Sequence, residues 1–338
     1  MSDANETPRA VRGPFTLEVT RIARLVVCDV AGDPTYAAIE VQVFDDDARG
    51  AGFVVLLGRG DGLVDVYRQP GLRLEPDAYR IGRGLGRWLE APIDPARFEI
   101  DPDGVALHVG LTDAEGRAIE LAIDDRDGRA RRRGDLLAPM GSTIEAPVSL
   151  MLVYMRGFDF VRTSGVRPRV TIGGHARALA PFPGPLSFGR LYARYASAPL
   201  IVTLNRACDG PLERLVLDEP ATLRAGAGAD AAVLRLSPGW PDLAAVSPGE
   251  RRDGEWVLGV ADVERFLAGT WTVTGTDDGA ALELAVTRGW TPRGLPPLYR
   301  FVTAVGKVFR EWPTTYRWRA SVRRAEPPTL RSRWERTR

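Results

Sequence analysis

The chain has 338 residues, of which 44% are hydrophobic and 26% charged. This composition is typical of a folded globular protein and excludes a disordered one. The net charge of +1 gives no reason to expect a nucleic acid partner. Two cysteines and two histidines exclude a disulfide framework and do not favour a zinc site, and we expect no cofactor.

The positive charge is concentrated near the C-terminus. Residues 289–338 contain twelve basic and three acidic residues. This predicts either a basic end that faces a partner or a solvated, arginine-rich tail. Residues 1–14 lack the apolar core of a signal peptide, and no apolar run approaches the roughly 18 residues that span a bilayer. The sequence therefore predicts a soluble, cytoplasmic protein.

Residues 1–13 are predicted as a disordered arm, and residues 14–208 as a β-barrel-like domain. Runs rich in Val, Ile, Tyr and Phe alternate with Gly/Asp turns, which is typical of an antiparallel meander. The predicted strands are 15–19, 22–30, 35–44, 52–57, 63–67, 97–100, 105–111 and 118–123. Asp-Gly and Glu-Gly turns join the last three of these strands. The charged segment that follows, 124–133, is predicted as a solvated loop.

The segment 142–185 is expected to organise the fold. Residues 148–154 are apolar and predict a buried strand. Aromatic and charged residues alternate over 156–162, and 169–172 is predicted as a return strand that ends at Gly173-Gly174. We expect a central hairpin whose polar groups gather at one end.

Residues 209–230 are rich in Gly, Pro and Ala and predict a connector to a second β-rich domain, 231–325. Within that domain, 262–268 has helical spacing, and an amphipathic helix is predicted over 298–312. Residues 326–338 are predicted as a basic tail. The fold class is therefore mainly β, with antiparallel meander sheets that form one or two barrels or sandwiches and a C-terminal amphipathic helix.

Two groups of side chains are candidates for chemistry. His175 follows a Gly-Gly turn, and histidine is the usual general base of enzymes; Asp159 and Tyr154 are the other candidate catalytic residues. Arginine and tyrosine side chains could hold a carboxylate or an enolising carbonyl of a ligand. These candidate ligand-binding residues are Arg156, Arg162, Arg190, Tyr192 and Arg194. The alternative interpretation is a solvated turn and a charged strand face.

The meandering strands, the Val170–His175 turn and the second β-rich half resemble the two-barrel lipocalin-like proteins related to carotenoid hydratases. Gly269-Thr270-Trp271 is similar to the glycine-x-tryptophan signature of lipocalins. In lipocalins that signature lies on the first barrel strand, whereas here too few residues follow it for a full second barrel. The resemblance implies lipocalin-like barrels and an apolar ligand of terpenoid or polyketide type, and it carries over no catalytic residues.

Three functions remain open. The chain lacks Gly-x-Ser-x-Gly, Walker, His-Glu-x-x-His and Cys-x-x-Cys motifs, which disfavours common hydrolases, NTPases and metalloenzymes. We expect a β-barrel protein that binds an apolar small molecule and, if it is an enzyme, hydrates, cyclises or isomerises it without a cofactor. The alternative is a non-enzymatic carrier or a module that contacts a membrane surface or an acidic partner through residues 298–338. A third hypothesis is a carbohydrate-active or carbohydrate-binding β-sandwich with a row of exposed tryptophans such as Trp88, Trp240 or Trp256.

Overall fold

The computed structural model describes residues 9–12, 14–139, 144–162, 168–181, 191–212, 221–261, 263–290, 295–305 and 312–337. Within them the strands form two mainly antiparallel sheets, and one α-helix, α1 (Pro297–Val305), lies near the C-terminus. Two short 3₁₀ helices cover Pro76–Tyr79 and Gly228–Asp230. The structure thus confirms the predicted class, a mainly β protein with antiparallel sheets and a helix near its C-terminal end.

Over the described residues, the large sheet contains sixteen strands. They are β1 (Arg9–Arg12), β2 (Phe15–Arg21), β3 (Arg24–Ala31), β4 (Tyr36–Asp46), β5 (Gly50–Arg59), β6 (Val64–Arg68), β7 (Leu85–Glu90), β8 (Ala96–Asp101), β9 (Gly104–Thr112), β10 (Ala118–Asp124), β11 (Gly134–Pro139), β12 (Leu150–Arg162), β13 (Arg169–Ile172), β14 (His175–Leu179), β15 (Leu191–Ala196) and β16 (Leu200–Leu204). The predicted meander of β8, β9 and β10 is confirmed. The parallel pair β6 and β7 is an exception to the antiparallel pattern.

The large sheet bends into a half-barrel at a bulge in β12. One edge of β12 pairs first with β16 and then, beyond the bulge, with β15. At the bulge Gly157 has a φ of +63°, a left-handed conformation that favours glycine, and the register with β11 shifts. The bulge also switches the inward-facing positions of β12, which are Met151, Val153 and Met155 before it and Phe158 and Phe160 after it. The same long strand can therefore line a curved interior on both sides of the bend.

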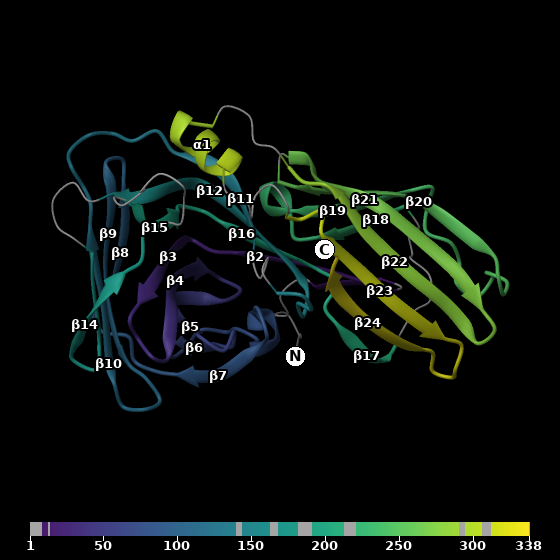
Figure 1. Cartoon of the computed structure of the whole chain (residues 1–338), viewed down its shortest axis with the longest axis horizontal. Helices are drawn as coiled ribbons and strands as arrows, with labels where there is room; N and C mark the ends of the chain where they lie inside the picture. Colours follow the sequence, from purple (N-terminus) through teal and green to yellow (C-terminus); the bar gives the residue numbers. More distant parts are fainter. Residues whose placement is uncertain are drawn as a thin grey trace.

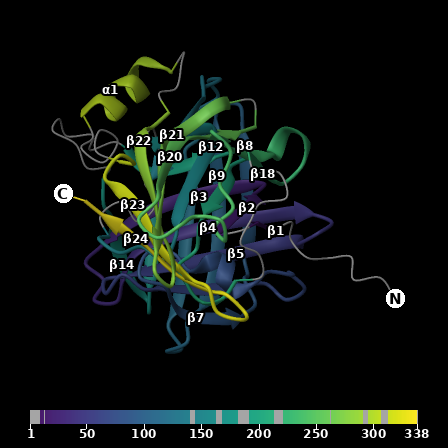
Figure 2. The ribbon, with the colours of Figure 1, turned by 90° about the vertical axis from the view of Figure 1, so that its right-hand side faces the viewer.

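The C-terminal sheet contains eight strands within the described part of the chain. They are β17 (Cys208–Pro211), β18 (Thr222–Ala225), β19 (Ala232–Ser237), β20 (Arg251–Val260), β21 (Val263–Thr276), β22 (Gly279–Arg288), β23 (Tyr316–Arg323) and β24 (Thr329–Arg336). Its strand order is β17-β24-β23-β22-β21-β20-β19-β18, so the last strand of the chain lies between β23 and the much earlier β17. In Figure 2 this sheet lies nearest the viewer, with α1 beside it.

Three hydrophobic cores separate the layers, which follow one another from left to right in Figure 1. The outer core lies between two layers of strands: one consists of β8–β10 and β13, and the other of β3–β5. The half-barrel core lies between β3–β6 and one face of β11, β12 and β16, and α1 covers part of it. The interdomain core lies between the other face of β12 and β16 and the C-terminal sheet. Met151 therefore faces one core and its neighbour Leu152 the other, as alternation along a strand requires.

Tryptophan dominates the interdomain core. Trp256, Trp271, Trp318 and Trp334 are all at most 1% exposed, and Trp240 is also buried there. Each such side chain removes a large apolar area from water, so this core holds the two sheets together. The hypothesis of a sugar-binding row of exposed tryptophans is wrong for Trp240 and Trp256, since both face inward.

The predicted central hairpin does not form. Residues 150–162 make the single strand β12, and the expected return strand β13 pairs instead with β10 and β14. Gly173 and Gly174 do adopt left-handed conformations, with φ of +60° and +77°, at the turn from β13 to β14. The glycines were therefore interpreted correctly, whereas the strand partner was not.

The C-terminal part contains more strand than predicted. The expected basic tail at 326–338 contains β24. The expected connector at 209–230 contributes part of β17 and all of β18. The segment 263–268, for which helical spacing was predicted, is the beginning of β21 and is not helical. The predicted helix 298–312 is α1 up to Val305, and residues 306–311 lie outside the described residues. In the predicted arm, residues 9–12 form β1, which pairs with β2.

Candidate ligand-binding site

A continuous row of side chains crosses the inner face of the half-barrel. Each residue of this central row is the register partner of the next residue on the neighbouring strand. In strand order, from β12 through β15, β3, β4, β5 and β6 to β7, the row consists of Phe160, Arg194, Val27, Glu40, Leu56, Val66 and Trp88. Residues paired across a sheet project to the same face. Arg194 and Glu40 are thus the two charged members of an otherwise apolar row.

Apolar side chains around the central row are incompletely covered. Val27, Val64, Leu85, Trp88 and Leu298 pack against the half-barrel core but remain partly exposed. Protein cores are normally packed at the density of organic crystals, which leaves side chains like these buried. The face therefore retains apolar surface that an apolar ligand could cover favourably.

A chain of polar side chains runs along the same face. The Tyr79 hydroxyl donates to Gln42 Oε1 at 3.2 Å, and Gln42 Nε2 donates to Glu40 Oε1 at 2.6 Å. Gln42 is fully buried, and Tyr79 also packs on Trp88 with ring centroids 5.2 Å apart. Burial raises the pKa of Glu40, although the hydrogen bond from Gln42 and the charge of Arg194 oppose the shift. A carboxyl with a raised pKa next to apolar surface is a candidate proton donor.

Arg194 supplies a cation at the other end of this polar group. Its Nη2 lies 3.1 Å from Asp29 Oδ2, and it stands two strands from Glu40 in the central row. A guanidinium offers several donors in a fixed plane and suits a carboxylate or carbonyl oxygen of a ligand. Glu40 and Arg194 together could thus orient the polar end of a molecule.

A second polar cluster surrounds Asp159, which is itself fully buried, at the edge of the same strands. Its Oδ1 accepts hydrogen bonds from Arg162 Nη2 at 2.7 Å and from the Tyr299 hydroxyl of α1, and its Oδ2 accepts one from the Tyr195 hydroxyl at 3.3 Å. Burial, together with the negative charge of Asp159, raises the pKa of Tyr195 to about 12 and also raises that of Tyr299. The Arg162, Tyr195 and Tyr299 donors all point at the carboxylate of Asp159, and Tyr299 belongs to α1. This arrangement favours a role of Asp159 in anchoring α1.

The neighbouring loop contributes a buried ion pair to this cluster. Arg131 Nη1 lies 2.6 Å from Asp125 Oδ2, and both side chains are at most 4% exposed. Asp125 also accepts the backbone N–H groups of Val105 and Arg162. The charged segment 124–133 is therefore more than the predicted solvated loop, because Asp125 and Arg131 are taken inside.

The structure brings together only some of the predicted site residues. Asp159 and Arg162 are in contact, and Arg194 and Tyr192 lie on the adjacent β15. Tyr154 is buried in the interdomain core, 3.5 Å from Asp135 Oδ2, and Arg156 pairs with Asp230 at 2.6 Å. His175 is exposed at the start of β14, away from these groups, and Arg190 lies outside the described residues.

Sequence reasoning missed Glu40, Gln42 and Tyr79. Glu40 and Gln42 lie in a strand that was correctly predicted. The sequence signal for a polar site there was that these two polar residues alternate with the apolar Ile39, Val41 and Val43. That pattern alone indicates an ordinary solvated face. Only the knowledge that both faces of β4 are covered makes the two polar residues unusual.

Comparison of the chain with protein-family models, with curated proteins and with solved structures finds no match. The fold and the site define a mainly β protein with one half-barrel, and the lipocalin-like resemblance stays a prediction. Among the described residues no group of three or more His, Cys, Asp or Glu side chains could hold a metal ion. In the same part of the chain, no helix is long and apolar enough to cross a membrane.

Proposed function

We propose that the half-barrel binds an apolar small molecule with one polar or ionisable end. The observation that supports this proposal is the central row, in which the partly exposed Val27 lies between Glu40 and Arg194 and the partly exposed Trp88 lies at one end. Ligand sites are typically apolar with a few convergent polar groups and a perturbed pKa. The apolar body would lie against Val27 and Trp88, the partly exposed apolar members of the row.

The polar end would be held between Glu40 and Arg194. At a pH at which Glu40 is protonated, its carboxyl can donate a proton to an alkene or carbonyl, and the Tyr79–Gln42 chain fixes its orientation. Hydration, cyclisation or isomerisation would each use such a proton without a cofactor. In a carrier, the same groups would only bind and orient the ligand.

Two measurements test this proposal. Native mass spectrometry of the freshly purified protein should show a bound small molecule, and titration with Nile red should give saturable fluorescence. Val27→Trp fills the face and should weaken Nile red binding by about tenfold or more. Val257→Trp is the matched control, because Val257 is also a partly exposed strand residue but lies on the other sheet.

The proposal is wrong if the wild-type protein carries no small molecule and binds no Nile red. It is equally wrong if Val27→Trp and Val257→Trp bind the dye alike. Glu40→Gln separates binding from turnover, since the amide preserves the shape of the side chain but cannot donate a carboxyl proton.

A further inference from the structure

A hollow lined by arginine lies on the outer face of the C-terminal sheet, and it is separate from the half-barrel. The pocket has a volume of about 650 Å³ and opens over β17, β24 and β23. Three arginines, Arg319, Arg331 and Arg333, line it together with one acid, Asp209. Two further acids outside the lining, Glu283 and Glu335, also pair with these arginines. The remaining lining consists of short side chains, namely Ala207, Cys208, Ala320, Ser321 and Ser332.

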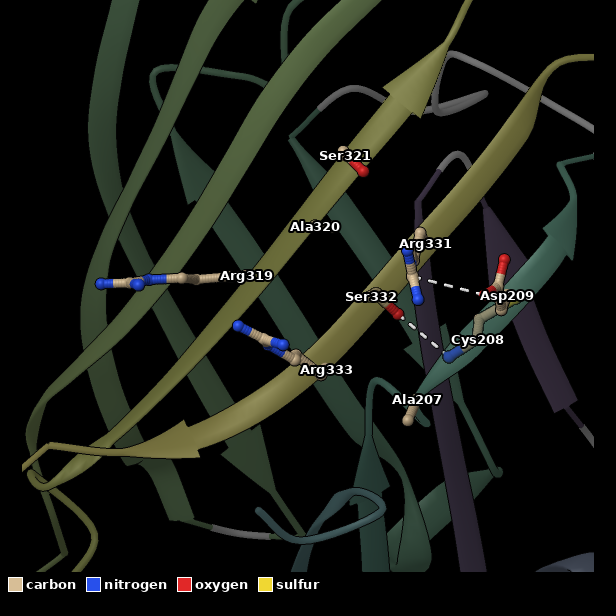
Figure 3. A pocket seen from close by; sticks show the side chains of 9 residues that line it. All are labelled: Ala207, Cys208, Asp209, Arg319, Ala320, Ser321, Arg331, Ser332 and Arg333. Atoms are coloured by element: carbon tan, nitrogen blue, oxygen red, sulfur yellow. Dashed lines mark hydrogen bonds and ion pairs between the residues drawn. The ribbon is translucent and has the colours of Figure 1, made fainter. Parts of the chain in front are cut away.

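Two of these arginines are placed directly opposite each other. Arg319 of β23 and Arg333 of β24 are register partners, and Figure 3 shows both side chains on the same side of the sheet. Like charges at such positions destabilise a sheet. Glu335 relieves the repulsion, because its carboxylate lies 3.3 Å from Arg319 Nη1 and 2.5 Å from Arg333 Nη2. One internal carboxylate thus bridges the two opposed guanidinium groups.

The existing ion pairs leave most of the arginine surface available. The Arg331 side chain is 80% exposed beside Asp209, and the Arg333 side chain is 71% exposed beside Glu335. Ion pairs between exposed side chains contribute little and exchange readily for better partners. A ligand that brings several carboxylates at once would therefore compete well with them.

The spacing of the arginines fits an extended polypeptide. Arg331 and Arg333 are two residues apart on β24, so they repeat at about 7 Å, as do Arg317 and Arg319 on β23. An extended chain with an acidic residue at every second position has the same repeat. We propose that this surface binds an acidic, extended segment of a partner polypeptide, with its carboxylates between Arg319, Arg331 and Arg333.

The same surface is poorly suited to nucleic acid or lipid. Single-stranded nucleic acids are bound by stacking on aromatic side chains, and none projects from the described outer face of β20–β24. The large exposed hydrophobic residues of the described chain are Leu89 and Phe301, and neither belongs to this sheet. Charge and hydrogen bonding are thus what the surface offers, which matches an acidic polypeptide.

The test uses a fluorescein-labelled peptide of alternating glutamate and threonine, with binding measured by fluorescence anisotropy on the whole protein at low salt. Arg331→Gln/Arg333→Gln should weaken binding by about tenfold or more. The matched control is Arg224→Gln/Arg235→Gln, which removes the same charge from exposed positions at the other edge of the same outer face. The control should bind within about twofold of the wild type. Urea unfolding of both double variants checks that they fold.

Ser321→Glu, which places a carboxylate in the pocket while all three arginines remain, should also weaken binding. The proposal is overturned if the wild type does not bind the peptide, or if the two double variants lose binding equally. It is also overturned if phosphatidylserine vesicles or oligo-dT bind more tightly than the peptide and show the same dependence on Arg331 and Arg333. A lysine-threonine peptide should not compete, and competition by it would contradict recognition of carboxylates.

Discussion

The Tyr299 hydroxyl of α1 donates a hydrogen bond to the buried carboxylate of Asp159, 140 residues earlier in the chain. The Tyr299 ring packs on Phe158, with centroids 5.3 Å apart, so the residue combines an apolar contact with a charged acceptor. This is the polar contact by which α1 is anchored to the edge of β12. Hydrogen bonds to charged groups are among the stronger ones in proteins.

We predict that Tyr299→Phe destabilises the fold by about 1 to 3 kcal/mol, because it keeps the ring and removes only the hydroxyl. Urea unfolding measures this loss. Tyr316→Phe is the control, since Tyr316 is equally buried but donates to the neutral carbonyl oxygen of Ile144 at 3.3 Å. A loss for Tyr299→Phe no larger than that for Tyr316→Phe would contradict the anchoring role of Asp159.

The stability of the protein should depend on the titration of Glu40. Burial raises its pKa, so the folded state keeps this proton to a higher pH than the unfolded chain does. The free energy of unfolding therefore falls as the pH rises from the ordinary glutamate pKa through the raised one, and it stays lowered above that.

Glu40→Gln cannot titrate, so it should gain stability relative to the wild type across the same interval. Urea unfolding of both proteins from about pH 4 to about pH 8 gives the difference at each pH. Asp65, which burial also shifts upward, titrates in both proteins and cancels from that difference. A difference that does not change with pH would show that folding does not raise the pKa of Glu40.

The bulge in β12 should not tolerate a side chain. A Cβ at Gly157 would lie 2.1 Å from Ser197 Oγ, and the backbone there is left-handed. Gly157→Ala should therefore destabilise by about 1 to 3 kcal/mol, measured by thermal or urea unfolding. Gly174→Ala is the matched control, because Gly174 is also left-handed but its Cβ would meet nothing within 4 Å. If both variants lose the same stability, the close approach to Ser197 is irrelevant.

The two cysteines should differ in reactivity. Burial raises the pKa of Cys28 to about 12, which leaves almost no thiolate at neutral pH, and its side chain is fully covered. Cys208 is partly exposed in the arginine-lined pocket. Iodoacetamide on the native protein should modify Cys208 alone, as peptide mapping by mass spectrometry would show. Modification of Cys28 at a comparable rate would mean that the outer core opens readily.

Turn residues in the sequence predicted the hairpins that join neighbouring strands, but not the pairing of strands far apart in the sequence. The glycine-containing turns predicted β8–β10 and the β13–β14 turn correctly, and Gly116, Gly173 and Gly174 adopt the left-handed conformation that glycine favours. The partner of β13 could not be predicted, since β10 supplies it from some fifty residues earlier. The sequence did not show that residues 156–162 continue the strand predicted at 148–154, because a bulge reverses the alternation of buried positions at Gly157.

The basic tail could have been recognised as a strand. Leu330, Ser332 and Trp334 alternate with Arg331, Arg333 and Glu335, which is the pattern of a strand with one buried face. The prediction of a basic tail used the count of positive charges and not this alternation. For the candidate site, Arg194 was found from its neighbours on one strand, whereas Glu40 required the pairing of β3 with β4 and β15.

The pairing of β17 with β24 has a consequence for biosynthesis. Cys208 and Ser332 are register partners, and the hydrogen bond between them spans 124 residues. Until the ribosome has delivered those residues, β17 has no neighbour and the tryptophan layer lacks Trp318 and Trp334. Such distant contacts make folding slow and leave apolar surface uncovered in the meantime. We therefore expect the nascent chain to depend on a chaperone until its last strand emerges.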